Sequence, residues 1–278
     1  MTVWSQGQIL GDQEPLIGAA DRALEHGIGL FETLRTWSGR PLLLGHHLQR
    51  LQRSAQALRL PLDPGDLPGE QTVAEMLNAG DWKGDAVVRI TVSGGSDVGG
   101  PARVWMRSRP LPAPIREAGA AVVLGGYCLS WYDVLARHKT LNYWSKDLAR
   151  DRAQTLGADE ALLGTPDGRI WEGTRFNLFL VQGRDVITPS LDGPLLPGIM
   201  RGLVLELARG LGLTVEEVDV RAGDIDAADE VFLTNAVRGI VPVGYAPGGP
   251  LAAPGPITRG LLKEFQNWLA THRGKAKA

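Results

Sequence analysis

The chain has 278 residues, of which 44% are hydrophobic and 22% are charged, values that are ordinary for a globular protein. Its formal net charge of -2 gives no electrostatic footprint for nucleic acid, and it contains no apolar run of about 18 residues that could cross a membrane. The single cysteine, Cys128, excludes an internal disulfide and a multi-cysteine metal site. We therefore expect no metal, no nucleic acid and no membrane among its partners, and a cytoplasmic protein without a secretory signal.

Hydrophobic periodicity predicts a mixture of helices and strands along the chain. Apolar residues at helical spacing from Leu48 to Leu58 predict the first helix, and β-branched runs predict strands at residues 86–92 and 103–106. Further strands are predicted at residues 120–124, 169–179, 215–220 and 230–233, and further helices at residues 148–156, 199–211 and 258–269. Because strands and helices do not alternate regularly, we expect a mixed α/β (α+β) protein rather than a dinucleotide-binding fold.

A proline-rich stretch divides the chain. Residues 109–114 read Arg-Pro-Leu-Pro-Ala-Pro, and three prolines in alternate positions favour an extended connection over a helix or a central strand. We therefore expect a small N-terminal domain over residues 1–110, a linker over residues 111–118 and a larger domain over residues 119–278. A surface loop inside a single domain would explain the same stretch.

A lysine and a downstream glutamate suggest a particular chemistry. Lys139 opens the run Lys-Thr-Leu-Asn-Tyr, and Glu172 lies in the run Arg-Ile-Trp-Glu-Gly. A lysine amine can form a Schiff base with an aldehyde, and a buried carboxylate can keep a pyridine nitrogen protonated. Taken alone, the two residues are explained more simply as an exposed lysine and a turn carboxylate.

Four further segments, taken with these two residues, resemble the class IV aminotransferase family, whose fold type IV enzymes use pyridoxal 5'-phosphate (PLP). In the family's order they are residues 21–35, the His-His-Leu-Gln-Arg-Leu run at 46–51, the Leu-Pro-Gly-Ile-Met-Arg run at 196–201 and the Thr-Asn-Ala-Val run at 234–237. The resemblance implies a small α/β N-terminal domain, a larger C-terminal domain with a β-barrel-like core, PLP between the two, and a homodimer.

The resemblance also implies roles for residues around the cofactor ring. Lys139 would hold PLP covalently and then act as the catalytic acid and base, and Glu172 would accept the proton of the pyridinium nitrogen. Tyr143, four residues after the lysine, would donate a hydrogen bond to the ring oxygen O3', although an aromatic residue of a helix core would occupy the same position. Phe31 and Trp131 are candidate walls of the substrate pocket.

The phosphate of PLP would be held by three segments. Arg50 would bind it through a bidentate guanidinium, unless this arginine only lies on the polar face of a helix. The backbone amides of Ile199 and Met200 would bind it at a helix N-terminus, where an anion gains from unpaired N–H groups. Asn235 and Ala236 would form a second turn that contacts the phosphate.

Within the family, these segments are most similar to aminodeoxychorismate lyases, which release 4-aminobenzoate and pyruvate from 4-amino-4-deoxychorismate in folate biosynthesis. A small-molecule amino substrate follows from that similarity. The alternative is a class IV aminotransferase acting on branched-chain or D-amino acids, and a more remote one is a non-catalytic PLP-binding protein. D-Amino acid aminotransferases carry an arginine where this chain has Ser93, and the glycine-rich residues 93–100 offer no arginine for a substrate carboxylate.

Overall fold

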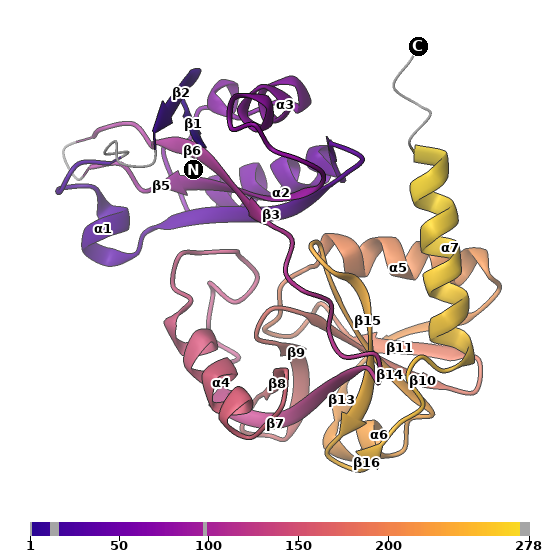
Figure 1. Ribbon diagram of the computed structural model, residues 1–278. Helices are drawn as coiled ribbons and strands as arrows, with labels where there is room; N and C mark the ends of the chain where they lie inside the picture. Colours follow the sequence, from indigo (N-terminus) through magenta and orange to yellow (C-terminus); the bar gives the residue numbers. More distant parts are fainter. Residues whose placement is uncertain (1, 12–16, 97–98, 273–278) are drawn as a thin grey trace. The chain divides into compact units, whose positions relative to one another are not determined.

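The computed structural model describes residues 2–11, 17–96 and 99–272 (Figure 1). Asp97 and Val98 of the glycine-rich segment lie outside the described residues. By its internal contacts the chain divides into two compact units. The first consists of Met1–Pro112 with His138–Asn142, and the second of Ala113–Arg137 with Tyr143–Ala278.

The first unit is built on one sheet with the strand order β2-β1-β6-β5-β3-β4, in which every neighbouring pair is antiparallel. Its strands are β1 (Thr2–Ser5), β2 (Gln8–Gly11), β3 (Gly29–Trp37), β4 (Arg40–Pro41), β5 (Ala86–Ser93) and β6 (Val104–Pro110). Its helices are α1 (Arg22–His26), α2 (Leu44–Ala57) and α3 (Glu70–Ala79), with a 3-10 turn (Pro64–Asp66) before α3.

Side chains of β3 and β5 alternate between the two faces of this sheet, as the period of a strand requires. One face carries Leu34 and Ile90, which pack with Leu51 of α2 and Met76 of α3 into the core of the unit. The other face of the sheet carries Phe31, which therefore points away from the core of the unit.

The segment His138–Asn142 lies along β3 and belongs to the first unit, whereas the sequence placed it in the larger domain. The Phe31 N–H donates to the Lys139 carbonyl at 2.9 Å, and the Leu141 N–H donates to the Gly29 carbonyl at 3.1 Å. A Cβ atom on Gly29 would lie 2.6 Å from the Leu141 side chain, so only glycine admits the segment at this point.

The second unit is built on a ten-stranded sheet that closes on itself. Its strands are β7 (Ala120–Cys128), β8 (Glu160–Gly164), β9 (Arg169–Gly173), β10 (Asn177–Gln182), β11 (Asp185–Pro189), β12 (Thr214–Val218), β13 (Val220–Arg221), β14 (Glu230–Asn235), β15 (Gly239–Ala246) and β16 (Gly249–Pro250). Strands β10, β14, β15, β7, β8 and β9 follow one another in the hydrogen-bonded order, and the pair Asn177–Glu172 joins β9 back to β10. The predicted barrel-like core is therefore confirmed.

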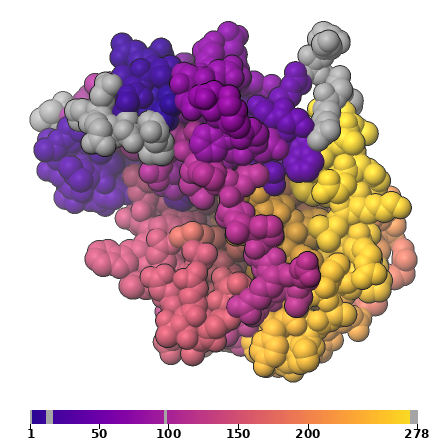
Figure 2. All heavy atoms as spheres, viewed as in Figure 1, coloured from indigo at the N-terminus to yellow at the C-terminus, as the bar shows by residue number. Residues whose placement is uncertain are grey.

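Four helices accompany this barrel: α4 (Trp144–Thr155), α5 (Ile199–Gly210), α6 (Ala222–Asp226) and α7 (Pro256–His272). Helix α7 runs along the surface of the unit in the space-filling view, at the yellow end of the colour bar (Figure 2). The carboxylate of Glu230 accepts hydrogen bonds from the Ile257 and Thr258 N–H groups, so a strand of the barrel caps this helix. Within the described ranges, no helix is long and apolar enough to span a bilayer.

Most predicted elements form close to their expected bounds, but two predicted strands are each divided in two. The strand expected at 215–220 is interrupted at Asp219, which separates β12 from β13. The helices expected at 199–211 and 258–269 are α5 and α7, and the strand expected at 86–92 is β5. The single strand expected at 169–179 is wrong, because residues 174–176 turn the chain back and divide it into β9 and β10.

Candidate functional site

In the first unit, a buried cluster of charged residues joins β3 to α2. The Glu32 side chain is 1% exposed and accepts two hydrogen bonds from Arg50, from Nε at 2.8 Å and from Nη2 at 2.7 Å. Because a carboxylate can only accept, the ring nitrogen Nδ1 of His47 must donate to it, at 2.7 Å. Burial alone would raise the pKa of Glu32, but Arg50 and His47 outweigh it and lower this pKa to about 2.

Arg50, predicted to bind a phosphate, therefore presents its bidentate fork to Glu32. Its side chain is only 14% exposed, whereas Arg53 on the next turn of α2 is exposed. The interpretation of Arg50 as a merely solvated helix residue is thus wrong. Burial lowers the pKa of His47, and the charges of Arg50 and Lys139 lower it further against the opposing effect of Glu32. Lys139 therefore lies within electrostatic reach of this cluster.

The predicted reactive lysine lies beside an aromatic ring of β3. The Lys139 Nζ is 4.6 Å from the centroid of the Phe31 ring, and the guanidinium carbon of Arg89 is 3.6 Å from the same centroid. Both distances are those of cation–π contacts. Phe31, predicted only as a wall of the substrate pocket, thus contacts Lys139, and Arg89 adds a second cation that the sequence had not singled out.

In the second unit, the predicted glutamate contacts a lysine that the sequence had not singled out. The Lys146 Nζ donates to Oε1 of Glu172 at 2.6 Å, and the Leu196 N–H donates to Oε2 at 3.0 Å. The Lys146 Nζ also lies 5.5 Å from the ring of Tyr143, the residue that precedes α4. Burial alone would lower the pKa of Lys146, but the charges of Glu172, Tyr143 and Tyr127 outweigh it and raise this pKa.

A bulge in β9 turns the Glu172 side chain toward α4. In the register between β8 and β9, Leu163 faces Glu172 while Gly164 faces Ile170, so Trp171 is an extra residue. Trp171 and Leu163 belong to the hydrophobic cluster beneath α4, whereas Ile170 belongs to the cluster inside the barrel. Trp171 and Glu172 thus lie on one side of the strand although they are consecutive, which is the effect of a bulge.

The start of α5 has the features of an anion site. Gly198 precedes the helix, no side chain in the described part of the chain caps its first turn, and no acidic residue lies in that turn. The amides of Ile199 and Met200 are therefore available to an anion at a helix N-terminus. Asn177 holds the turn by donating from Nδ2 to the Leu196 carbonyl at 2.9 Å, and a Cβ atom on Gly198 would collide with Oδ1 of Asn177.

The second predicted phosphate turn follows β14. The Oδ1 atom of Asn235 accepts from the Val237 N–H at 3.0 Å and from the Arg238 N–H at 2.8 Å. Its Nδ2 donates to the Arg175 carbonyl at 3.3 Å. The Asn235 side chain thus shapes the turn, a local role that asparagine often has, while the prediction had made it a donor to phosphate. Ala236 lies inside the same turn, half-buried.

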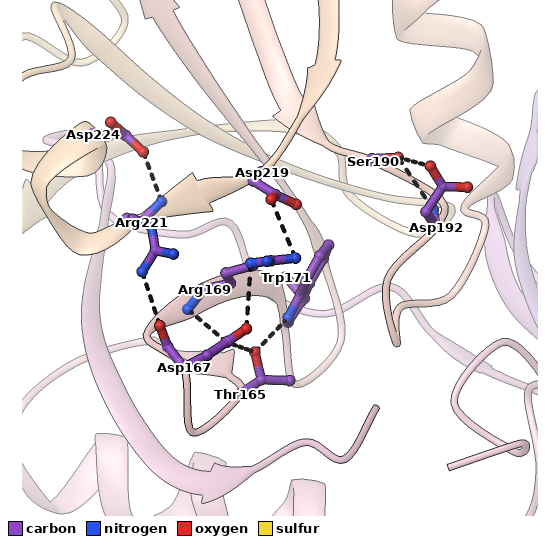
Figure 3. A network of polar contacts seen from close by, with 9 residues as sticks. All are labelled: Thr165, Asp167, Arg169, Trp171, Ser190, Asp192, Asp219, Arg221 and Asp224. Atoms are coloured by element: carbon purple, nitrogen blue, oxygen red, sulfur yellow. Dashed lines mark hydrogen bonds and ion pairs between the residues drawn. The ribbon is translucent and has the colours of Figure 1, made fainter. Parts of the chain in front are cut away.

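Trp131, the other predicted wall, packs against the hairpin formed by β8 and β9. Its ring meets Trp171 edge to face at 4.9 Å, and the guanidinium of Arg169 lies 5.0 Å from it. Figure 3 shows a polar network that includes Trp171, in which its indole N–H donates to Thr165 and Arg169 contacts Asp167. Trp131 itself is 40% exposed.

Sequence reasoning missed Lys146, Asn177 and Arg89. A signal for Lys146 was present, since a lysine in the first turn of a helix opposes the helix dipole and therefore needs an acidic partner. No comparable signal marked Asn177, because its role depends on a contact with the Leu196 carbonyl, 19 residues further along the chain. Arg89 lies in the middle of a predicted strand, where a charged residue indicates a face that is not core.

Comparison with known proteins places this architecture in a family. The family model described as amino-transferase class IV matches residues 29–244. The chain is 30% identical over 277 residues to a protein of Methanocaldococcus jannaschii that is provisionally named a branched-chain-amino-acid aminotransferase, with 96% of each chain covered. It is 28% identical to the aminodeoxychorismate lyase of Bacillus subtilis, over 86% of this chain and 85% of the relative.

Among solved structures, a hypothetical aminotransferase from Mycobacterium tuberculosis in its PLP-bound form superimposes with a TM-score of 0.89 at 25% identity. The alignment covers 98% of this chain and 100% of that one. The chain therefore belongs to the class IV aminotransferase family, which consists of PLP-dependent aminotransferases and lyases.

The donor groups of this chain fit PLP. The uncapped start of α5 suits its phosphate, and a carboxylate such as Glu172 suits its ring nitrogen. Once bound, PLP supplies a ring that withdraws electrons from the carbon next to the substrate's amino group. The relatives include both lyases and aminotransferases, so family membership alone leaves the reaction open.

Proposed function

We propose that this protein is a 4-amino-4-deoxychorismate lyase that forms 4-aminobenzoate and pyruvate. The observation that carries the proposal is the cationic face beside Lys139. Arg89 lies against Phe31 together with Lys139, and Arg107 of β6 stands directly opposite Arg89 in the sheet. Guanidinium groups and an ammonium group on one face attract carboxylates. A chorismate-derived substrate brings two carboxylates, whereas a branched-chain amino acid needs an apolar pocket for its side chain.

Ser93 gives a reason to set a D-amino acid aminotransferase aside. The Ser93 side chain is fully buried, and its hydroxyl donates to Asp21 at 2.6 Å. The same Asp21 accepts from the Ala23 N–H and caps α1. The position that carries a carboxylate-binding arginine in those enzymes is thus committed to holding α1 against β5. A branched-chain aminotransferase remains the alternative, because the Methanocaldococcus jannaschii relative has that provisional name.

Among the lysines near the proposed cofactor residues, we propose that Lys139 is the one that binds the PLP aldehyde. The aldehyde carbon of PLP is attached to C4 of the ring, opposite the ring nitrogen. Lys146 is hydrogen-bonded to Glu172, the proposed partner of that nitrogen. It would therefore lie near the nitrogen end of the ring, away from the aldehyde. Tyr143 and Arg50 keep their proposed roles at O3' and at the phosphate, with Ile199, Met200 and Ala236 as backbone donors.

The covalent assignment can be tested directly by reduction. Borohydride treatment of the holoenzyme followed by peptide mapping should place the pyridoxyl group on Lys139. The Lys139→Ala variant should lose the visible absorption band, and Lys146→Met should keep it. A pyridoxyl group found on Lys146 would refute the assignment of both lysines.

The reaction can be tested with two substrate mixtures. Chorismate, an ammonia source and an aminodeoxychorismate synthase should yield 4-aminobenzoate when this protein is added, and none with Lys139→Ala. Leucine, isoleucine or valine with 2-oxoglutarate should give little glutamate. Rapid glutamate formation without any 4-aminobenzoate would overturn the lyase and support the branched-chain aminotransferase.

A homodimer forms part of the same proposal. Trp144 is 80% exposed and Leu148 is 57% exposed, and their spacing of four residues places both on one side of α4. Tyr132 is 93% exposed. Large apolar side chains at such exposure are typical of an interface with another chain. Sedimentation at micromolar concentration should show a dimer, and a fully active monomer would contradict the proposal.

We place the protein in the cytoplasm, where its single cysteine needs no partner.

A further inference from the structure

Lys146 is a cation at a place where helix geometry disfavours one. It is the third residue of α4, after Trp144 and Ser145, and Tyr143 is the N-cap. The free N–H groups of a first turn carry partial positive charge, so acidic residues are favoured there and basic ones are not. Among the described residues no side chain caps this turn. An anionic partner offsets the unfavourable position of Lys146, and that partner is Glu172.

The contact between Lys146 and Glu172 is short and shielded from water. The Nζ–Oε1 distance is 2.6 Å, and the two side chains are 17% and 4% exposed. The other carboxylate oxygen accepts from the Leu196 backbone at 3.0 Å. Tyr143 at the start of α4 and Tyr127 at the end of β7 are further titratable groups that, together with Glu172, raise the pKa of Lys146.

We propose that Lys146 is a resident counter-ion of Glu172 that weakens the protonation of the cofactor's ring nitrogen. This inference rests on the proposed role of Glu172 as the partner of that nitrogen. A carboxylate that already holds an ammonium group at 2.6 Å forms a nearly neutral pair with it. A ring nitrogen beside such a pair gains less from carrying a proton than it would beside a lone carboxylate. Lys146 is thus a positioning residue that acts on the cofactor through Glu172.

This effect bears on the choice between the two reactions of the family. Transamination requires a proton to be placed on C4' of the cofactor, and a strongly electron-withdrawing, protonated ring promotes that step. In elimination, the electron pair freed at the substrate carbon instead forms a new carbon–carbon double bond, and the electron pair of the breaking C–O bond leaves with the departing enolpyruvyl group. A less protonated ring therefore favours elimination over transamination. Lys146 would accordingly help the proposed lyase to avoid losing its cofactor as pyridoxamine phosphate.

The decisive experiment measures the protonation state of the ring nitrogen as a function of pH. Holoenzyme is prepared with PLP labelled with ¹⁵N in the ring, and the nitrogen chemical shift is followed against pH. The midpoint of protonation should rise by about one to two pH units in Lys146→Met, a ten- to hundred-fold gain in proton affinity. Lys146→Arg keeps the charge and should titrate like the wild type. Asp147 lies on the same helix as Lys146 and forms an exposed ion pair with Arg175. The Asp147→Asn variant should therefore also show the ring-nitrogen titration of the wild type.

Two further measurements extend the test. Lys146→Met should bind PLP about tenfold more tightly, because the unloaded variant leaves Glu172 without its cation and gains more from the cofactor. It should also convert a larger share of turnovers into pyridoxamine phosphate. If Lys146→Met does not fold, Lys146→Gln removes the charge while it keeps a hydrogen-bond donor.

The outcomes separate this inference from the role of Glu172. Glu172→Gln should shift the ring nitrogen toward its unprotonated form. Titration curves of the wild type and Lys146→Met that coincide, while Glu172→Gln differs, would overturn the counter-ion and leave Glu172 in its role. Coincidence of all three curves would show that Glu172 is not the partner of the ring nitrogen, and both ideas would fall.

Discussion

Replacing Glu32 with glutamine should remove a defined part of the pH dependence of stability. The side chain is 1% exposed, and its pKa falls from 4.5 to about 2 in the folded protein. A depressed pKa means that folding favours the ionised form, so the contribution is complete above pH 4.5 and is lost as the pH falls toward 2. The shift of about 2.5 units at about 1.4 kcal/mol per unit corresponds to about 3 kcal/mol.

Urea unfolding of the two proteins at a series of pH values between 7 and 2 measures this quantity. The free energy of unfolding of the wild type should fall more steeply below pH 4.5, and its difference from Glu32→Gln should shrink by about 3 kcal/mol. Glu75→Gln, which removes an exposed carboxylate of α3 in the same unit, controls for the loss of one negative charge. If the difference in the free energy of unfolding between the wild type and Glu32→Gln stays constant with pH, the conclusion that Glu32 is buried in its ionised form is refuted.

The remaining predictions concern the cofactor. Arg50→Ala should raise the PLP dissociation constant roughly 10- to 100-fold, and Arg53→Ala on the same helix should leave it unchanged. The comparison is best made in a Glu32→Gln background, where no buried carboxylate is left unpaired, and equal affinities would remove Arg50 from the site. Glu172→Gln should retain PLP but lower kcat roughly 10²- to 10³-fold, and normal turnover would show that Glu172 serves no chemistry. Gly198→Ala should weaken PLP binding and lower Tm, whereas Gly202→Ala, which meets no atom within 4 Å, should stabilise α5 by up to about 1 kcal/mol. Similar behaviour of the two alanine variants would contradict the tight contact at Gly198.

The sequence predicted the elements whose patterns are local. The apolar residues of α5 recur at helical spacing until Gly212 ends the pattern, and only Arg89 interrupts the β-branched run of β5, so both elements could be placed within a residue or two. Lys139, Glu172 and Arg50 could be named because their segments together resemble a known family. The burial of Arg50 could not be predicted, since it depends on Glu32 from another strand.

The sequence could not predict the geometry that strand pairing creates. The run from Arg169 to Phe179 looks like one strand, and only its fold back on itself closes the barrel. Strict alternation would place Trp171 and Glu172 on opposite faces, but the bulge in β9 places both toward α4. The contact with Lys146 follows from that bulge, so no spacing rule could have found it.

Residues 138–142 belong to the first unit, and this limits where the chain can be cut into fragments that each contain one whole unit. The chain passes from one unit to the other after Pro112, after Arg137 and after Asn142, so neither unit is a continuous piece of sequence. A fragment ending at Pro112 would lack the segment that bonds to the edge of β3, and it would not carry Lys139. Fragment complementation, domain shuffling and recombination between relatives should therefore tolerate breakpoints poorly between Pro112 and Tyr143. A continuous fragment that joins Lys139 to the rest of the first unit must also contain Ala113–Arg137 of the second.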